Sequence, residues 1–125
     1  MPLKIFNGPI IRAGQFQSDV LSITDYFIVG LGTPDGWTPA MASLIVSPDG
    51  DRYYDLYDGS GREFVFNVVL PGTMIRVNSH LLMSAAFIRL RSGTRDYPIT
   101  QQSQRTFTLV GASKLAMADE MEATK

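Results

Sequence analysis

Apolar and polar residues alternate with a period of two along much of this chain. Every second residue is apolar in several short stretches, and the members of each stretch are expected to share one face of a strand. These stretches contain Leu21 and Ile23; Phe27, Val29 and Leu31; Ala42, Leu44 and Val46; Ala86, Ile88 and Leu90; and Phe107 and Leu109. The alternation is typical of half-buried β-strands, so the pattern predicts strands along most of the chain.

The strongest alternation lies between residues 64 and 70. The residues of its apolar face are Phe64, Phe66, Val68 and Leu70. Val65 and Val69 make the opposite face apolar as well. A strand that is apolar on both faces is usually covered on both, so this stretch is predicted to be a central strand.

Turn sequences separate the predicted strands. Pro48–Asp51 contains Asp-Gly, which supplies the positive φ that a hairpin turn needs, and Tyr54 and Leu56 are expected to face inwards after it. Asp58–Gly61 and Pro71–Gly72 are further turns. Residues 30–36 hold three glycines and a proline, so we expect a loop there.

Short strands separated by turns predict an all-β fold, an antiparallel β-sandwich. A jelly roll is favoured over an immunoglobulin-like topology, because the Cys…Trp…Cys frame of the latter is absent. Three parts are expected: an N-terminal arm over residues 1–9, the sandwich domain over 10–111, and a flexible or short helical C-terminal tail over 112–125. The tail is rich in alanine and other helix-favouring residues.

Composition narrows the class of protein. The 125 residues are enough for one domain with its own core, and without cysteine there are no disulfides or thiolate metal sites. A net charge of −1 does not favour nucleic acid or an anionic membrane as a partner. No apolar run approaches the length of a membrane span or of a signal-peptide core, so we expect a product made in the cytoplasm.

Candidate catalytic residues are few. His80 is the only histidine, and we interpret it as a capping or surface residue, since neither a triad partner nor further zinc ligands can be placed beside it. The carboxylates Asp49, Asp51, Asp55, Asp58 and Glu63 cluster in sequence. Their spacing does not fit an EF-hand, and turn formation is favoured over calcium binding, which stays open. We expect no enzymatic activity and no cofactor.

Two further features suggest binding rather than catalysis. Phe87, Arg89 and Arg91 share one strand face, which favours a protein interface over a nucleic-acid backbone because the overall charge is near neutral. Trp37 follows a loop directly. It is expected to plug one end of the sandwich, with stacking on a sugar as the alternative.

Several ordered segments resemble small proteins encoded among the structural genes of tailed bacteriophages. The segments are Trp37-Thr-Pro-Ala40, Ser47-Pro-Asp-Gly50, Asp55-Leu-Tyr57, Phe87-Ile-Arg-Leu-Arg-Ser-Gly-Thr94, Pro98-Ile-Thr-Gln101 and Arg105-Thr-Phe-Thr-Leu109. Among such proteins, the jelly-roll capsid decoration, or cement, proteins are similar in size. The resemblance implies a virion structural protein on the capsid surface that binds the major capsid protein and forms a homo-oligomer, a dimer or trimer, with no nucleic acid or membrane as a partner.

On that interpretation, partner contacts are expected from the two terminal segments and from the Arg/Phe face. The candidate residues are Leu3, Ile5, Phe6, Phe87, Arg89, Arg91, Leu115, Met117 and Met121. Two alternatives stay open. One is a tail or fibre module that binds host glycans on Trp37 and on Tyr53 or Tyr57, and the other is a head–tail connector component.

Overall fold

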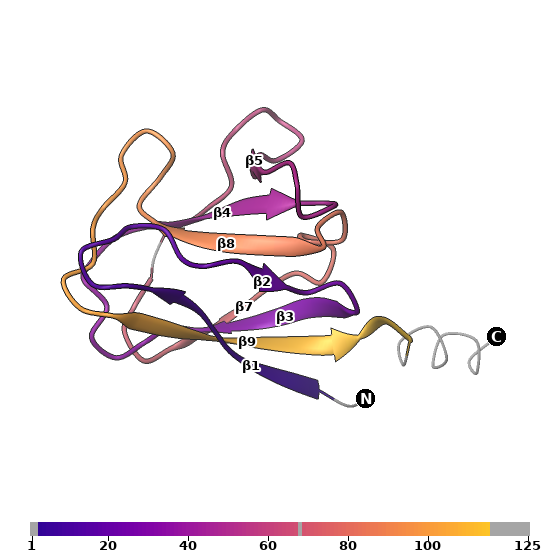
Figure 1. The fold of residues 1–125 in the computed structure, drawn as a ribbon, viewed down its shortest axis with the longest axis horizontal. Coiled ribbons are helices and arrows are strands. Elements are labelled where there is room, and N and C mark those ends of the chain that lie inside the picture. Colours follow the sequence, from indigo (N-terminus) through magenta and orange to yellow (C-terminus); the bar gives the residue numbers. More distant parts are fainter. Residues whose placement is uncertain (1–2, 68, 116–125) are drawn as a thin grey trace.

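The computed structural model describes residues 3–67 and 69–115, and within them the chain forms nine strands (Figure 1). The strands are β1 (Leu3–Ile11), β2 (Leu21–Ser22), β3 (Tyr26–Gly32), β4 (Ala42–Ser47), β5 (Tyr54–Asp55), β6 (Val65–Phe66), β7 (Met74–Arg76), β8 (Phe87–Ser92) and β9 (Arg105–Ser113).

Two antiparallel sheets pack face to face, as Figure 1 shows, so the predicted β-sandwich is confirmed. Sheet A has the strand order β1-β9-β3-β7, and sheet B has the order β2-β8-β4-β5, with β6 also pairing with β4. Each sheet therefore interleaves strands from the early and late parts of the chain. Almost every pairing joins residues that are far apart in sequence.

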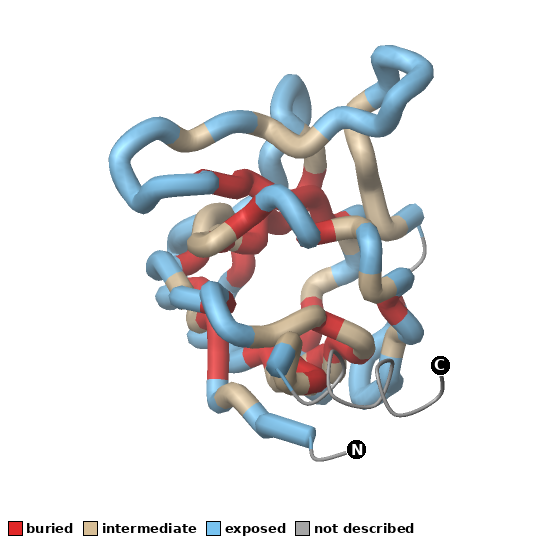
Figure 2. The backbone as a smooth tube through the Cα atoms, turned by 90° about the vertical axis from the view of Figure 1, so that its right-hand side faces the viewer, coloured by how far each residue is buried: buried red, intermediate tan, exposed pale blue. Residues whose placement is uncertain are grey.

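The core lies between the two sheets and is apolar. Phe107 and Leu109 of β9 face Ile88 and Leu90 of β8, and all four are fully or almost fully buried, as their alternation predicts. Figure 2 shows the buried backbone in the middle of the molecule and the exposed loops around it. Trp37 closes one end of this core, where its ring meets Phe107 edge to face at 5.2 Å.

The prediction that three residues of β3 share one face is wrong, because the strand contains a bulge. Phe27, Val29 and Leu31 were expected to share one face, but Ile28 and Leu31 are buried in the core, and Phe27 and Val29 are half-buried. The register against β9 shifts between Ile28 and Gly30. A bulge adds one residue to the strand, so the alternation changes sides there. The strand also continues to Gly32, into the stretch expected to be a loop.

The central strand of sheet B is β4, and not the 64–70 stretch. All six residues of β4 are buried, whereas β6 is only two residues long and Leu70 is 57% exposed. One edge of β4 is shared: β5 pairs at Ile45 and Val46, and β6 pairs at Ala42 and Ser43. No length of β4 remains to pair with residues after Phe66. Val68 lies outside the described residues.

The turn at Asp49-Gly50 is confirmed, and the orientation expected for Tyr54 is wrong. Gly50 has a φ of +84°, and a Cβ there would lie 2.9 Å from the Phe87 ring, so both conformation and space require glycine. Tyr54 is exposed because β5 lies at the rim of the sandwich. Leu56, two residues later, packs against the core as expected.

The expected boundaries of the arm and the tail are also wrong. Residues 3–9 belong to β1, and Leu3 pairs with Ala112 of β9. The strand β9 continues to Ser113, so the expected tail begins inside the sheet. The rest of the expected tail, residues 116–125, lies outside the described residues.

We expect Phe107→Ala to lower the free energy of unfolding by about 3–5 kcal/mol, because it leaves a cavity where both sheets meet. Leu70→Ala is the matched control and should cost less than about 0.5 kcal/mol, because Leu70 is mostly exposed. Urea denaturation followed by circular dichroism measures both. Equal losses for the two variants would mean that Phe107 contributes no more to stability than an exposed residue, which would contradict its place in the core.

Candidate functional site

The face of sheet A that points away from the core carries a band of apolar side chains. Opposite residues of antiparallel strands point to the same side of a sheet, and the register places Ile5, Val110 and Gly30 in one row. In the adjacent row, Leu31 and Leu109 are buried in the core, so the first row faces outwards. We call this band the sheet A outer face. Its apolar members are Leu3, Ile5, Phe27, Val29, Met74 and Val110.

Two glycines flatten the sheet A outer face. A Cβ atom at Gly30 would lie 3.0 Å from the Met74 sulfur, and one at Gly32 would lie 3.4 Å from the Met74 Cε. Met74 therefore lies over both glycines. Leu3, Ile5 and Met74 are 60%, 56% and 59% exposed. Large apolar side chains gathered on one exposed face are typical of a binding surface.

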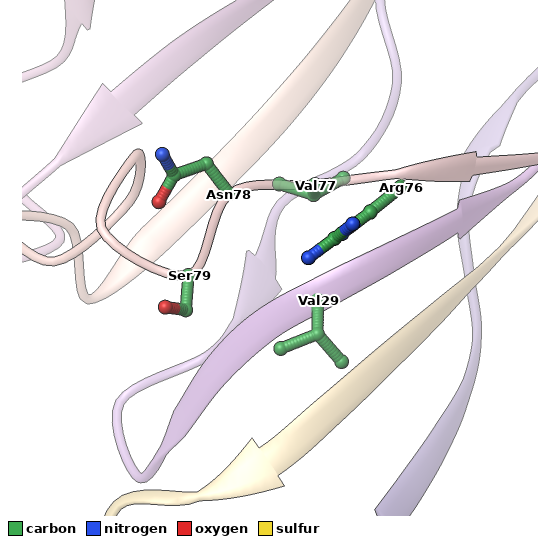
Figure 3. A pocket seen from close by; sticks show the side chains of 5 residues that line it. All are labelled: Val29, Arg76, Val77, Asn78 and Ser79. Carbon is green, nitrogen blue, oxygen red and sulfur yellow. The ribbon is translucent and has the colours of Figure 1, made fainter.

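A depression of about 520 Å³ adjoins this face at the end of β7. Figure 3 shows Arg76 extending from β7 towards β3 and Val29, with Ser79 nearby and Asn78 turned to the other side. Arg76 is exposed, so it places a positive charge at the border of the apolar band. A partner that presents an apolar surface with a carboxylate at its border would match this arrangement.

A second depression, of about 530 Å³, lies on the other side of the same segment. Phe64 and Phe66 line it and meet edge to face at 5.1 Å. Polar side chains at its border are Asp58, Arg76, Asn78 and His80. Aromatic rings beside hydrogen-bonding groups can bind a sugar or another small polar ligand.

The expected Arg/Phe interface on sheet B is contradicted at Arg91. Its side chain is only 7% exposed, and its guanidinium forms ion pairs of 2.8 Å with Asp55 and 2.8 Å with Glu63. Its Nε donates to the Ser43 hydroxyl at 2.9 Å, and that hydroxyl donates to the Gly93 carbonyl. All of its donor nitrogens therefore have partners inside the protein, and Arg91 is unavailable to another molecule.

The neighbouring arginines extend this cluster. Arg95 donates to the Tyr57 hydroxyl, and this bond raises the pKa of Arg95. Its guanidinium also lies 3.4 Å from Asp55. The guanidinium of Arg89 lies 5.6 Å from the centre of the Tyr53 ring. Charged groups and short strands thus cover much of the outer side of sheet B, whereas the outer side of sheet A carries the apolar band.

Four of the five clustered carboxylates have structural partners: Asp49, Asp55, Asp58 and Glu63. An Asp49 oxygen accepts hydrogen bonds from the N–H groups of Arg52 and Asp51. These bonds, the one from Arg52 most, lower the pKa of Asp49 below its ordinary 3.8. Bonds from the Ser60 hydroxyl and then from the Arg62 N–H lower the pKa of Asp58 in the same way. Among the described residues, no group of three or more His, Asp or Glu side chains is placed to hold a metal ion.

Trp37 occupies the structural position that was predicted. It is 3% exposed, and its indole N–H donates to the Ala40 carbonyl at 3.2 Å. A buried ring cannot stack on a sugar, so the alternative interpretation of Trp37 is wrong. His80 lies at the surface, as predicted.

The other predicted contact residues fall into three groups. Leu3 and Ile5 are exposed on the sheet A outer face, and Leu115 is exposed after β9. Phe6 and Phe87 are half-buried: Phe6 meets Tyr26 edge to face, and Phe87 packs against Gly50. Met117 and Met121 lie outside the described residues.

The alternation of the sequence did not identify Met74, Val29 or Val110 as members of the candidate surface. The usable signal was the pair Gly30 and Gly32, because glycine inside a strand often marks a close approach of another group. The three side chains themselves are brought together by pairings between β3, β7 and β9.

Comparison of the chain with protein-family models, curated proteins and solved structures found no match. In the part of the chain that the structure describes, no helix is long and apolar enough to span a bilayer.

We expect Arg91→Ala to lower the free energy of unfolding by about 2–3 kcal/mol. This is less than the ~3–5 kcal/mol typical of a fully buried pair, because Asp55 and Glu63 stay partly in contact with water. Arg89→Ala is the matched control and should cost at most about 1 kcal/mol, the worth of an exposed cation–π contact. Urea denaturation of both variants measures the difference, and similar costs would contradict the structural role of Arg91.

The turn aspartates Asp49 and Asp58, whose carboxylates accept hydrogen bonds within their own turns, lead us to expect a loss of stability in acid. Their pKa values are lower in the folded chain than the ordinary 3.8, so their contribution is present above about pH 4 and is lost as the pH falls below it. The double variant Asp49→Asn and Asp58→Asn should therefore lose less stability than the unaltered chain between about pH 5 and pH 2, the range in which carboxylates titrate. Asp51→Asn in the same turn is the control, and thermal melts across this range provide the measurement. Parallel curves for the unaltered chain, the double variant and Asp51→Asn would refute the stabilising role of the Asp49 and Asp58 carboxylates.

Proposed function

We propose that this chain is a capsid decoration protein of a tailed bacteriophage that docks on the major capsid protein through the sheet A outer face. The observation that carries this proposal is the apolar band itself. Leu3, Ile5 and Met74 are each more than half exposed on a face that two glycines flatten. Such a face suits a broad, flat contact with another protein better than a small ligand.

The strand order supports a jelly-roll interpretation. Sheet A, β1-β9-β3-β7, faces sheet B, β2-β8-β4-β5, and each sheet alternates strands from early and late in the chain. An eight-stranded double sheet of two Greek keys has this kind of interleaving, and viral capsid proteins use it. The same fold also occurs in lectins, so the face supports the choice of function more than the fold does.

The positions of the chain ends agree with the decoration role. Leu3 pairs with Ala112, so the start of β1 and the end of β9 lie together at one end of the outer face. Segments that continue from either end would start beside the docking surface. Their contacts with neighbouring capsid subunits would add buried apolar area, at roughly 25 cal/mol per Å², across the seams that resist the pressure of packaged DNA.

Glycan binding by a tail or fibre module is the second candidate. The depression beside Phe64 and Phe66 favours it, because aromatic rings there adjoin the polar groups of Arg76 and His80. Trp37 has no part in this version, since it is buried. Tyr57 remains partly exposed, but its hydroxyl is held by Arg95.

Location on the particle tests the proposal. Gold-labelled antibody against the chain should cover the head of intact source particles at many positions. Label confined to the tail tip would refute decoration and favour the glycan candidate. Particles without label would refute both.

The docking face is tested by binding of purified chain to heads that lack it. Met74→Asp should weaken this binding at least tenfold, or about 1.4 kcal/mol, because it places a charge within the apolar band. Met83→Asp makes the same change at an exposed methionine outside the band and should bind like the unaltered chain. Equal binding by both variants would place the contact on another surface.

A further inference from the structure

The edge strand β1 differs from the other sheet edges in its length. The other outer strands of the two sheets, β2, β5, β6 and β7, are two or three residues long, whereas β1 has nine residues. Short edge strands prevent pairing with other chains, and a long apolar one invites it. The edge of β1 is therefore the place where an added strand would find a template.

Part of this edge is already closed. Ile10 donates its N–H to the Asp19 carboxylate at 2.9 Å, and its carbonyl accepts the N–H of Asp19 at 3.1 Å. These bonds show that the main-chain groups of Ile10 point away from β9. Among the described residues, no segment covers the corresponding side of Leu3–Asn7. The open edge is thus five residues long.

The register shows which groups this open edge presents. In an antiparallel pair, residues alternate between those that exchange hydrogen bonds with the neighbour and those that point away from it. Lys114 donates to Asp25, so the even-numbered residues at this end of β9 bond towards β3 and the odd-numbered ones bond towards β1. Lys4 and Phe6 lie opposite odd-numbered residues. The main-chain groups of Leu3, Ile5 and Asn7 therefore point outwards.

We propose that two copies of this chain pair antiparallel through Leu3–Asn7 about a twofold axis at Ile5. Ile5 then lies opposite Ile5 of the other copy, and Leu3 lies opposite Asn7. Each of these opposing pairs exchanges two main-chain hydrogen bonds, so the outward groups of the open edge are satisfied by an identical edge. A twofold contact of this kind is isologous and closes after two copies.

The side chains also complement themselves in this arrangement. Ile5 meets Ile5 on the outer face, where each is more than half exposed in a single copy. On the other face, Lys4 lies opposite Phe6 of the second copy. Within one copy the Lys4 ammonium already lies 5.8 Å from the Phe6 ring, so a cation–π contact between copies requires little rearrangement.

Pairing would join the two copies of sheet A into one continuous sheet, with both outer faces on the same side. This inference rests on the edge of β1 alone and not on the proposed function. A chain that labels heads but stays monomeric would overturn the dimer and leave the function in place.

Charged substitutions at Ile5 test the proposed twofold axis, with the association of the full chain measured by sedimentation equilibrium. The unaltered chain should form dimers. Ile5→Lys and Ile5→Asp should each raise the dissociation constant at least tenfold, because like charges then lie directly opposite each other. An equimolar mixture of these two variants should form a mixed dimer, because the opposite charges then face each other.

Met74→Lys is the matched control. It places the same charge on the same face but at the opposite edge of sheet A, so the chain should still dimerise. Circular dichroism confirms that each variant is folded, which the exposure of Ile5 and Met74 leads us to expect. A monomeric unaltered chain, dimers of Ile5→Lys, or no mixed dimer would each overturn the proposal.

Discussion

The strand β9 lies between β1 and β3 and pairs with both along most of its length. The last strand of the sandwich is thus inserted beside the first, and sheet A is complete only when the two ends of the chain meet. Phe107 and Leu109 of this strand also supply the centre of the core. The sheet A outer face, the open edge and the core all depend on this one non-local pairing, whose loop-closure entropy has to be overcome before its contacts form.

The two outer sides of the sandwich differ in how they are covered. On sheet B, Arg91 would be an isolated buried charge without Asp55 and Glu63, so its ion pairs hold the segment from β5 to β6 over the sheet. On sheet A no segment among the described residues does this, and Gly30 and Gly32 keep the surface flat. The apolar side that remains is the one to which we assign a partner.

The proposed docking face and the proposed dimer edge meet at Ile5. This residue lies in the apolar band and at the centre of the open edge. If both proposals hold, a dimer presents one face of double width to the capsid. The docking contact and the dimer contact then share the region around Ile5. The two contacts use different atoms, because docking involves side chains and pairing involves the main chain.

The sequence by itself determined the fold class, the Asp49-Gly50 turn, and the inward-facing residues of β8 and β9, because these follow from local periodicity and turn chemistry. It did not determine that, among the described residues, only Val65 and Phe66 of the 64–70 stretch pair with a strand. Nor did it determine that a bulge moves Leu31 to the core side, or that Arg91 is buried while Arg89 is not. Nor did local patterns separate residues 3–9 from a free arm. Each of these features depends on which distant strand lies alongside. The alternation of apolar and polar residues along one strand contains no information about its neighbouring strand. The candidate surface was therefore decided by tertiary pairing, which assembles residues of β1, β3, β7 and β9 on one face.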